Sequence, residues 1–361
     1  MAEGIRSFEV IPYSLGFREE YVTSRGSLER RELILLRVVG EDGAVGLGEA
    51  VPLSLRGGES LTEISGELER MMSRLAGGKV GEALASVTSG GSTQLGISNP
   101  ARVAIEMALT ELEARRAGVP FYRQLAPESR PREIELNATL GAGDPASAAR
   151  EAHGWLEAGF RTFKVKVGDR ADVERVGLLR QEIGPEAIIR VDANGSWSLD
   201  EALERVDELA PLDIELFEEP VAGLEEMARF RDSTDVTVVA DESVSDRADA
   251  RRAEELGACD AVTVKLSKTG TLDPSLGSHL PTYLSSALDG PVGIAAALHV
   301  AMTTSGQADR SFAQGLATAR LFRETIAVGD PAWLIAPFTT VPEEPGLGIE
   351  IDEAALDTLR L

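Results

Sequence analysis

In the first fifty positions, apolar and polar residues alternate in a pattern typical of β-strands. Residues 8–15, 32–39 and 44–50 show this period of two, and Glu41-Asp42-Gly43 supplies a hairpin turn between the last two segments. The polar stretch 18–31 predicts a loop between the first two strands. A glycine-rich loop is expected at 55–58.

Helical periodicity follows this meander. Residues 61–75 are amphipathic, and Ser98-Asn99-Pro100 predicts the start of a second helix, with Pro100 at its first turn and Gly118 as its stop. Strands followed by helices predict an α+β domain over residues 1–130.

Beyond residue 130, short apolar strands alternate with longer amphipathic stretches such as 144–158 and 198–209. The strands are expected at 135–140, 161–167, 187–192, 213–218, 236–241, 261–265 and 283–286, with a weak eighth near 314–318. Their ends recur roughly every 25 residues, the size of one βα unit. We therefore predict an α/β fold, a TIM-like (β/α)8 barrel over 131–330 with an N-terminal capping domain, on which residues 330–361 pack back. A doubly wound sheet would need a glycine-rich phosphate turn after its first strand, and none is convincing.

Composition narrows the class of partner. The chain has 361 residues and a formal net charge of −24, which argues against nucleic-acid and anionic-membrane partners. We find no apolar run of membrane-spanning length, and no signal-peptide pattern at the start. The single cysteine, Cys259, fits a reducing cytoplasm. A small-molecule carboxylate is the expected partner, and a homo-oligomer is possible.

Lysine is rare and unevenly placed. Of 36 cationic side chains only five are lysines, and four of them lie in two short apolar segments. They are Lys164 and Lys166 in T-F-K-V-K-V-G, and Lys265 and Lys268 in V-K-L-S-K-T-G. Arginine cannot lose its proton in a protein, whereas a buried amine can. The placement predicts acid–base chemistry, with Lys268 expected to be an ordinary loop residue.

Five successive predicted strands end in an ionisable residue. These are Lys166, Asp192, Glu218, Asp241 and Lys265. In a barrel, the carboxyl ends of the strands converge on one mouth. Any one acid could be a helix N-cap, but the ordered set predicts three oxygen ligands for Mg²⁺, with Mn²⁺ possible and zinc disfavoured. Lys166 and Lys265 would flank the metal, and the metal together with Lys164 would lower the pKa of Lys166.

These motifs resemble the enolase superfamily, in its muconate-lactonising-enzyme subgroup. The resemblance rests on T-F-K-V-K-V-G, V-D-A-N-G-S-W, F-E-E-P, A-D-E-S and V-K-L-S-K-T-G, with V-G-L-G-E-A-V-P in the capping domain. It implies that Asp192, Glu218 and Asp241 bind Mg²⁺. It also implies that Lys166 and Lys265 are the acid–base pair, that Lys164 assists electrostatically, and that the capping loops set specificity.

Within the subgroup, the segments around residues 137–139, 283–294 and 314–318 look most like o-succinylbenzoate synthase of menaquinone biosynthesis. That resemblance implies a lyase, which removes water from 2-succinyl-6-hydroxy-2,4-cyclohexadiene-1-carboxylate. Ser285, Ser286 and Gly293 would then hydrogen-bond a distal carboxylate at a helix N-terminus, and Arg25 would contact substrate from a capping loop.

Two alternatives stay open. The first is an N-succinylamino acid or N-acyl amino acid racemase or a dipeptide epimerase, although the acidic D-x-D signature of dipeptide epimerases is not found. The second is a non-catalytic barrel that binds an acidic metabolite. Residues 271–281 are too short and broken for the usual sixth barrel helix, either because that helix is truncated or because residues are missing.

Overall fold

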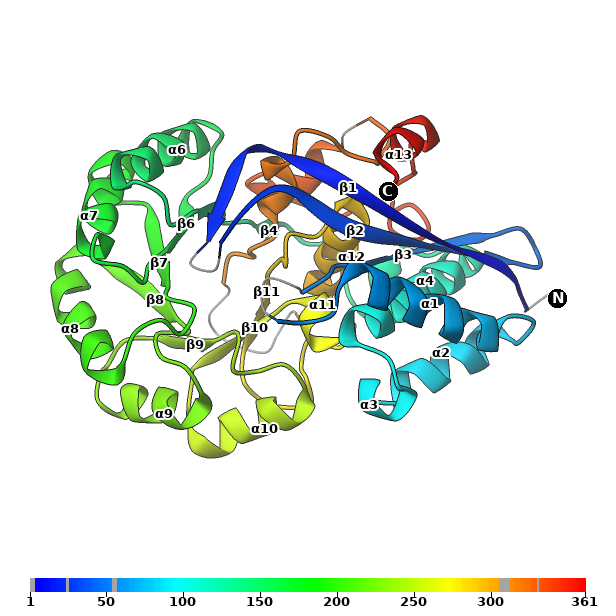
Figure 1. Ribbon diagram of the computed structural model, residues 1–361, viewed down its shortest axis with the longest axis horizontal. Coiled ribbons are helices and arrows are strands. Elements are labelled where there is room, and N and C mark those ends of the chain that lie inside the picture. Colours follow the sequence, from blue (N-terminus) through cyan, green and yellow to red (C-terminus); the bar gives the residue numbers. More distant parts are fainter. Residues whose placement is uncertain (1–3, 24–25, 54–56, 305–311, 330) are drawn as a thin grey trace.

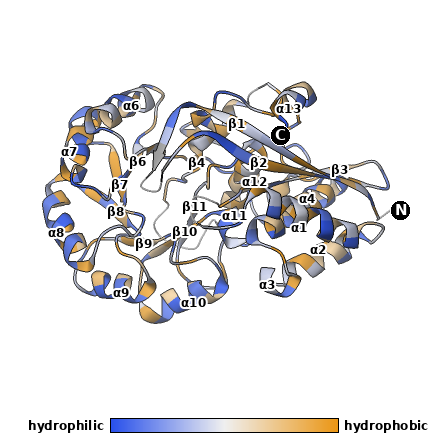
Figure 2. Ribbon diagram, viewed as in Figure 1, coloured by the Kyte–Doolittle hydropathy of each residue, from blue (hydrophilic) through white to orange (hydrophobic). Residues whose placement is uncertain are grey.

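The computed structural model describes residues 4–23, 26–53, 57–304, 312–329 and 331–361. Helices α6 to α10 form an arc around a parallel sheet on one side, and the N-terminal strands and helices lie on the other (Figure 1). The helices of the arc carry hydrophilic faces, whereas strand β7 inside it is largely hydrophobic (Figure 2). The predicted barrel with an N-terminal capping region is therefore confirmed.

The capping sheet has three antiparallel strands in the order β1-β2-β3. They span Ile5–Thr23, Gly26–Gly40 and Val45–Ala50. The expected loop over 18–31 is wrong, because the β1–β2 ladder continues through Gly16 paired with Arg30 to Tyr21 paired with Leu28. These residues are polar because the two strands run beyond the packed core, and Figure 1 shows them crossing toward β6. Arg25 lies outside the described residues, as do positions 54–56 of the second predicted capping loop.

The capping helices are α1 Leu61–Leu75, α2 Val80–Ser89, α3 Ser92–Leu95, α4 Asn99–Ala117 and α5 Phe121–Leu125. Helix α4 begins within the predicted segment, with Ser98 as its N-cap, and ends at the predicted Gly118, which has the left-handed conformation. It lies directly on β3, where a Cβ on Gly46 or Gly48 would stand 2.0 Å from a carbonyl oxygen of the helix. The two glycines therefore permit the close contact between helix and sheet.

The barrel sheet is parallel, in the order β11-β10-β9-β8-β7-β6-β5. Its strands are β5 Ala138–Leu140, β6 Thr162–Lys166, β7 Ile188–Asp192, β8 Ile214–Glu218, β9 Val238–Ala240, β10 Ala261–Val264 and β11 Thr282–Leu284. The weak eighth segment joins the two edges, because Gln314 bridges to Leu136 and Gly315 bridges to Ser285. The first predicted strand is split, since β4 (Ile134–Glu135) pairs instead with β12 (Phe338–Thr339).

The barrel helices follow their strands in turn. They are α6 Pro145–Glu157, α7 Asp172–Ile183, α8 Leu199–Leu209, α9 Leu224–Asp232, α10 Arg247–Leu256, α11 Leu266–Thr269 and α12 Pro291–Ala301, with short 3₁₀ turns η2 Ala210–Leu212, η3 Met302–Thr304, η4 Ala317–Leu321 and η5 Ala332–Leu334. As expected, the sixth helix is reduced to the single turn α11, and residues 271–280 form turns and bends. Strands β10 and β11 nevertheless pair directly, Val262 with Thr282, so the short connection leaves the sheet intact.

The C-terminal segment returns to the capping sheet. Helix α13 (Glu353–Leu359) lies beside β1, Arg360 bridges to Tyr13, and the Leu361 N–H donates to the Pro12 carbonyl at 3.0 Å. The division of the chain at residue 130 stays a prediction. Within the described part of the chain, no helix is both long and apolar enough to cross a membrane.

A buried carboxylate joins the capping domain to the barrel. Glu49 of β3 is 1% exposed; it accepts a hydrogen bond from the Tyr13 hydroxyl at 2.7 Å and another from the Gly290 N–H at 2.7 Å, at the start of α12. Burial and the neighbouring Asp289 raise the pKa of Glu49 to about 8. Arg31 of β2 also contacts the chain just before α12, because its guanidinium donates to the Ala287 carbonyl at 3.0 Å. The contact between the capping domain and the barrel therefore contains a carboxyl group, that of Glu49, which is largely protonated at neutral pH.

Glu49→Gln is expected to flatten the dependence of stability on pH. Between pH 4.5 and about 8 the unfolded chain has released the Glu49 proton while the folded protein keeps it, so wild-type stability falls as pH rises through this window. Glutamine cannot ionise. Relative to wild type, the variant should be more stable at pH 8.5 than at pH 5.5, by about 3 kcal/mol. Urea unfolding at both pH values measures this, with the exposed Glu69→Gln as control. Parallel pH profiles for wild type and Glu49→Gln would contradict it.

Candidate active site

The strand register brings the predicted charged residues to one end of the barrel. Lys166 of β6 is paired with Asp192 of β7, and Asp192 with Glu218 of β8. Asp241 directly follows β9 and Lys265 directly follows β10. Five consecutive strands therefore end in the five predicted residues, at the end of the sheet where barrel active sites lie.

Asp192, Glu218 and Asp241 form a compact acidic group. One carboxylate oxygen from each lies within 4.8 Å of the others, and all three residues are 0% exposed. Three buried carboxylates are costly unless cations compensate them. The donor set consists of oxygen alone, which suits a hard divalent cation such as Mg²⁺ or Mn²⁺. The residues present therefore fit the predicted metal.

The backbone around the triad is held in unusual conformations. Asn194 and Glu219 have positive φ angles of 49° and 40°, uncommon for residues other than glycine. The Glu219 carboxylate accepts the Asp241 N–H at 2.8 Å and so ties the end of β8 to the end of β9. Asn194 donates its N–H to Asp192 at 3.0 Å. Asn194 therefore fixes the Asp192 carboxylate, and Glu219 fixes the backbone from which the Asp241 side chain extends.

The three lysines that were predicted to take part surround the triad. The Lys164 ammonium lies 2.8 Å from Asp192 and 2.6 Å from Glu218. Lys166 lies 2.6 Å from the same Asp192 oxygen and donates to the Asn194 side chain at 2.9 Å. Lys265 contacts the Asp241 carboxylate from the opposite side. Lys166 and Lys265 are thus on strands separated by β7, β8 and β9, with the carboxylates between them.

Among the protein groups alone, the predicted lowering of the Lys166 pKa is not found. Burial and the nearby Lys164 charge both lower it, but the Asp192 carboxylate outweighs them and the pKa is raised. Burial also opposes the charge of Lys164, yet Asp192 and Glu218 raise its pKa well above the usual value. The prediction assumed the charge of a bound cation, which would offset the carboxylates.

Two residues beside the triad were not predicted to take part. Lys268, expected in a loop, lies in α11, is 6% exposed and places its ammonium 2.9 Å from Asp241. The single turn of α11 directs its side chain back toward the end of β9. The Tyr283 hydroxyl of β11 donates to the Glu218 carboxylate. The scarcity of lysine was a signal for Lys268, whereas nothing in the sequence pattern indicated Tyr283.

The predicted substrate contacts are less well placed. The Ser286 hydroxyl donates to Asp289 at 2.8 Å, and the Gly293 N–H is bonded to Glu49. The Ser285 N–H donates to the Val264 carbonyl at 2.8 Å, within the strand ladder. Protein carboxylates therefore already occupy the start of α12. A substrate contact by these residues stays a prediction that the geometry does not favour, and Arg25 is not described.

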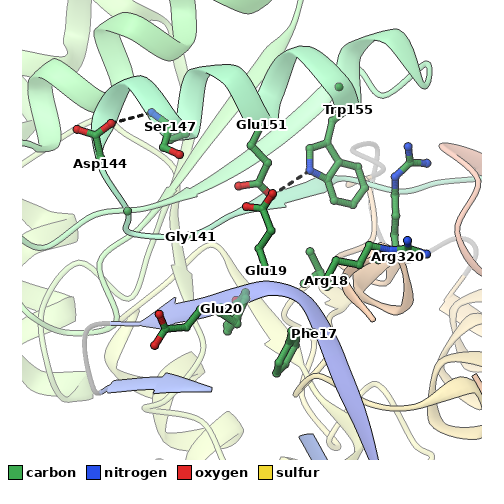
Figure 3. Close-up of a pocket in the computed structure, with 15 residues that line it drawn as sticks. Phe17, Arg18, Glu19, Glu20, Gly141, Asp144, Ser147, Glu151, Trp155 and Arg320 are labelled. Atoms are coloured by element: carbon green, nitrogen blue, oxygen red, sulfur yellow. Dashed lines mark hydrogen bonds between the residues drawn. The ribbon is translucent and has the colours of Figure 1, made fainter. Parts of the chain in front are cut away.

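Strand β1, helix α6 and the η4 turn line a cavity of about 430 Å³ beside the barrel rim (Figure 3). Glu19 of β1 and Glu151 of α6 point toward one another across it, and the Trp155 N–H donates to Glu151 at 3.3 Å. Arg18 donates to the Arg320 carbonyl at 3.1 Å and closes one end. The capping strands thus form a wall beside the barrel, while their part in specificity stays a prediction.

Comparison with known proteins agrees with this geometry. Residues 147–355 match the family described as enolase C-terminal domain-like, which covers more than half of the chain. Residues 12–125 match the mandelate racemase / muconate lactonizing enzyme N-terminal domain. The chain belongs to the enolase superfamily, in the muconate-lactonising-enzyme subgroup.

Three solved structures illustrate the range of activities among the relatives of this superfamily member. The muconate lactonizing enzyme of Pseudomonas fluorescens, in complex with muconolactone, is 26% identical with a TM-score of 0.90, over 100% of both chains. The N-succinyl Arg/Lys racemase of Bacillus cereus is 26% identical with a TM-score of 0.89, over 99% of this chain and 98% of its own. The dipeptide epimerase of Cytophaga hutchinsonii, in complex with Mg and D-Ala-L-Val, is 26% identical with a TM-score of 0.87, over 99% of this chain and 98% of its own.

None of these three proteins is an o-succinylbenzoate synthase. Two of them are named for inversion at a carbon centre, the alternative that the sequence left open. The superfamily and subgroup are therefore established for this chain. The dehydration predicted from residues 283–294 and 314–318 is not supported by these names.

Proposed function

We propose that this protein is a metal-dependent racemase or epimerase that inverts the α-carbon of an N-acylated amino acid, either a dipeptide or an N-acyl amino acid. The observation that carries the proposal is the pair of lysines on opposite sides of the carboxylate triad, Lys166 beside Asp192 and Lys265 beside Asp241. Inversion needs one proton acceptor and one proton donor on opposite faces of the same carbon.

Asp192, Glu218 and Asp241 would hold the cation, Mg²⁺ by preference or Mn²⁺. When bound, it supplies positive charge to the substrate carboxylate and so makes the α-proton more acidic. The neutral amine of one lysine then takes the α-proton as the C–H bond breaks. The ammonium of the other lysine gives a proton to the opposite face, so the protonation states of the pair are exchanged after each turnover.

The structure also orients these groups. The Asn194 side chain accepts from the Lys166 ammonium at 2.9 Å and fixes where its proton is presented. Lys164 is only 5% exposed and contacts two of the three carboxylates, so it is placed to stabilise negative charge that develops at the substrate carboxylate. We assign Lys164 an electrostatic role because it bridges two of the three carboxylates, and we assign the proton transfers to Lys166 and Lys265 because they lie on opposite sides of the triad.

A second candidate is the dehydration catalysed by o-succinylbenzoate synthase. A dipeptide carries an α-ammonium that needs a carboxylate partner, and segment 312–318, which closes the barrel, contains no acidic residue. An N-succinylamino acid and the succinyl-hydroxycyclohexadiene carboxylate both lack that ammonium. This observation favours the N-acyl amino acid branch of the main proposal and keeps the dehydration as the runner-up.

Solvent exchange separates these possibilities. Purified protein with Mg²⁺ is incubated in D₂O with each enantiomer of N-succinylamino acids, N-acetylamino acids and dipeptides, and loss of the α-proton signal is followed by ¹H NMR. We expect α-deuterium incorporation into both enantiomers of at least one class. In parallel, the succinyl-hydroxycyclohexadiene carboxylate is followed by its diene absorbance. Rapid loss of that absorbance with no α-exchange in any amino-acid substrate would overturn the racemase proposal and establish the dehydration, while no change in either assay would support the non-catalytic alternative.

A further inference from the structure

The three triad carboxylates share a pattern of contacts that separates their two oxygens. One oxygen of each accepts from a donor outside the proton-transfer pair: Asp192 Oδ1 from the Asn194 N–H, Glu218 Oε2 from the Tyr283 hydroxyl, and Asp241 Oδ1 from the Lys268 ammonium. The other oxygens, Asp192 Oδ2, Glu218 Oε1 and Asp241 Oδ2, face Lys164, Lys166 and Lys265. A cation bound by the triad would therefore face these three oxygens, in place of the ammonium groups that they contact here.

Among the three outer donors, Tyr283 is the neutral side chain, and its hydroxyl acts across the barrel. It lies on β11, three strands away from β8, which carries Glu218, so its hydroxyl reaches the carboxylate through the barrel interior. Tyr283 is 0% exposed. A phenol has an ordinary pKa of about 10 and is a hydrogen-bond donor at neutral pH.

The ring of Tyr283 is locked in place from below. The Arg190 guanidinium lies 5.3 Å from the ring centroid, and the Phe312 ring lies 5.6 Å away. Arg190 is itself fixed by the Glu215 carboxylate at 2.6 Å and by the Ala313 carbonyl at 2.7 Å. The packed ring therefore holds the hydroxyl beside Glu218. Arg190 contributes to this because its own hydrogen bonds fix the guanidinium that lies against the ring.

We propose that Tyr283 is a positioning residue that holds Glu218 with Oε1 turned toward the metal and thereby sets the metal affinity of the site. Partners that orient a metal-ligating carboxylate change the affinity for the metal by 10- to 100-fold when they are removed. This inference rests on the proposal that the triad holds the cation, and it is independent of which reaction the enzyme catalyses.

Tyr283→Phe tests the role, because phenylalanine keeps the ring packing and removes only the hydroxyl. Mg²⁺ affinity is measured by isothermal titration calorimetry, and Mn²⁺ affinity by electron paramagnetic resonance of the free ion. We expect the dissociation constant to rise 10- to 100-fold. At saturating Mg²⁺, kcat should fall by no more than a few-fold. The Mg²⁺-dependent rise in Tm should also be smaller than in wild type at a given concentration.

Tyr13→Phe is the matched control. It removes an equally buried tyrosine hydroxyl, one that donates to the Glu49 carboxylate at 2.7 Å in the capping domain. We expect its metal affinity to equal that of wild type. Unchanged affinity in Tyr283→Phe, or an equal loss in Tyr13→Phe, would overturn the role of Tyr283. Absence of metal binding by the wild-type protein would instead refute the metal site on which the inference rests.

Discussion

Alanine in place of Lys166 or of Lys265 is expected to abolish interconversion of the substrate enantiomers, with the rate falling at least about a thousand-fold. Each substitution removes the only proposed donor or acceptor on one face of the α-carbon, so neither direction of inversion can be completed. Polarimetry on each pure enantiomer, with Mg²⁺ saturating, measures the loss.

The two variants should differ in which substrate enantiomer still exchanges its α-proton with solvent. The remaining lysine can still remove and return the α-proton of the enantiomer that faces it, so each variant is expected to exchange one enantiomer in D₂O, and the two variants opposite ones. Lys79→Ala is the matched control, because the Lys79 side chain is 61% exposed and lies outside the barrel. Wild-type inversion by Lys166→Ala, or exchange of both enantiomers by both variants, would refute the two-base scheme.

Asp192→Asn is expected to lose metal binding and, with it, activity by at least about a thousand-fold. The substitution also leaves Lys164 and Lys166 buried without the carboxylate that lies 2.8 Å and 2.6 Å from them. Removing one partner of a buried ion pair destabilises a protein by about 3–5 kcal/mol. Two separate readouts therefore follow: calorimetric titration with Mg²⁺, and urea unfolding of the metal-free protein.

Asp200→Asn provides the control for this change, since it makes the same substitution on the exposed first turn of α8. In wild type, EDTA should abolish activity and added Mg²⁺ should restore it, whereas added Mg²⁺ should leave Asp192→Asn inactive. Full activity of the EDTA-treated wild type would exclude the metal from the reaction. Unaltered stability of Asp192→Asn would show that the lysines do not depend on this carboxylate.

The charged residues of the site could be predicted because their positions follow from periodic structure. Parallel strands in a barrel all present their carboxyl ends at one mouth, so residues at the ends of successive strands must converge. Lys166, Asp192, Glu218, Asp241 and Lys265 each occupy such an end, and the register of the sheet brings them together. The resemblance to the enolase superfamily rested on the same positions and was confirmed.

The hairpin of the capping domain shows where pattern fails. Residues 18–31 are polar, which is typical of loops, yet 18–23 and 26–31 extend the two strands beyond the core and over the barrel rim. A strand that does not bury one face against a core has no hydrophobic alternation to reveal it. Such a strand is defined by its hydrogen bonds to the neighbouring strand. The pattern of residues within a short stretch of sequence does not show this pairing.

The sequence by itself determined the barrel with its capping region, the acidic triad and the lysine pair, because each depends on local periodicity and the placement of strand ends. Only the tertiary structure decided which groups orient them. Tyr283 reaches Glu218 across the barrel, Lys268 turns back onto Asp241, and Glu49 occupies the start of α12. These contacts join residues far apart in the chain or on different strands, so their geometry depends on how the elements pack.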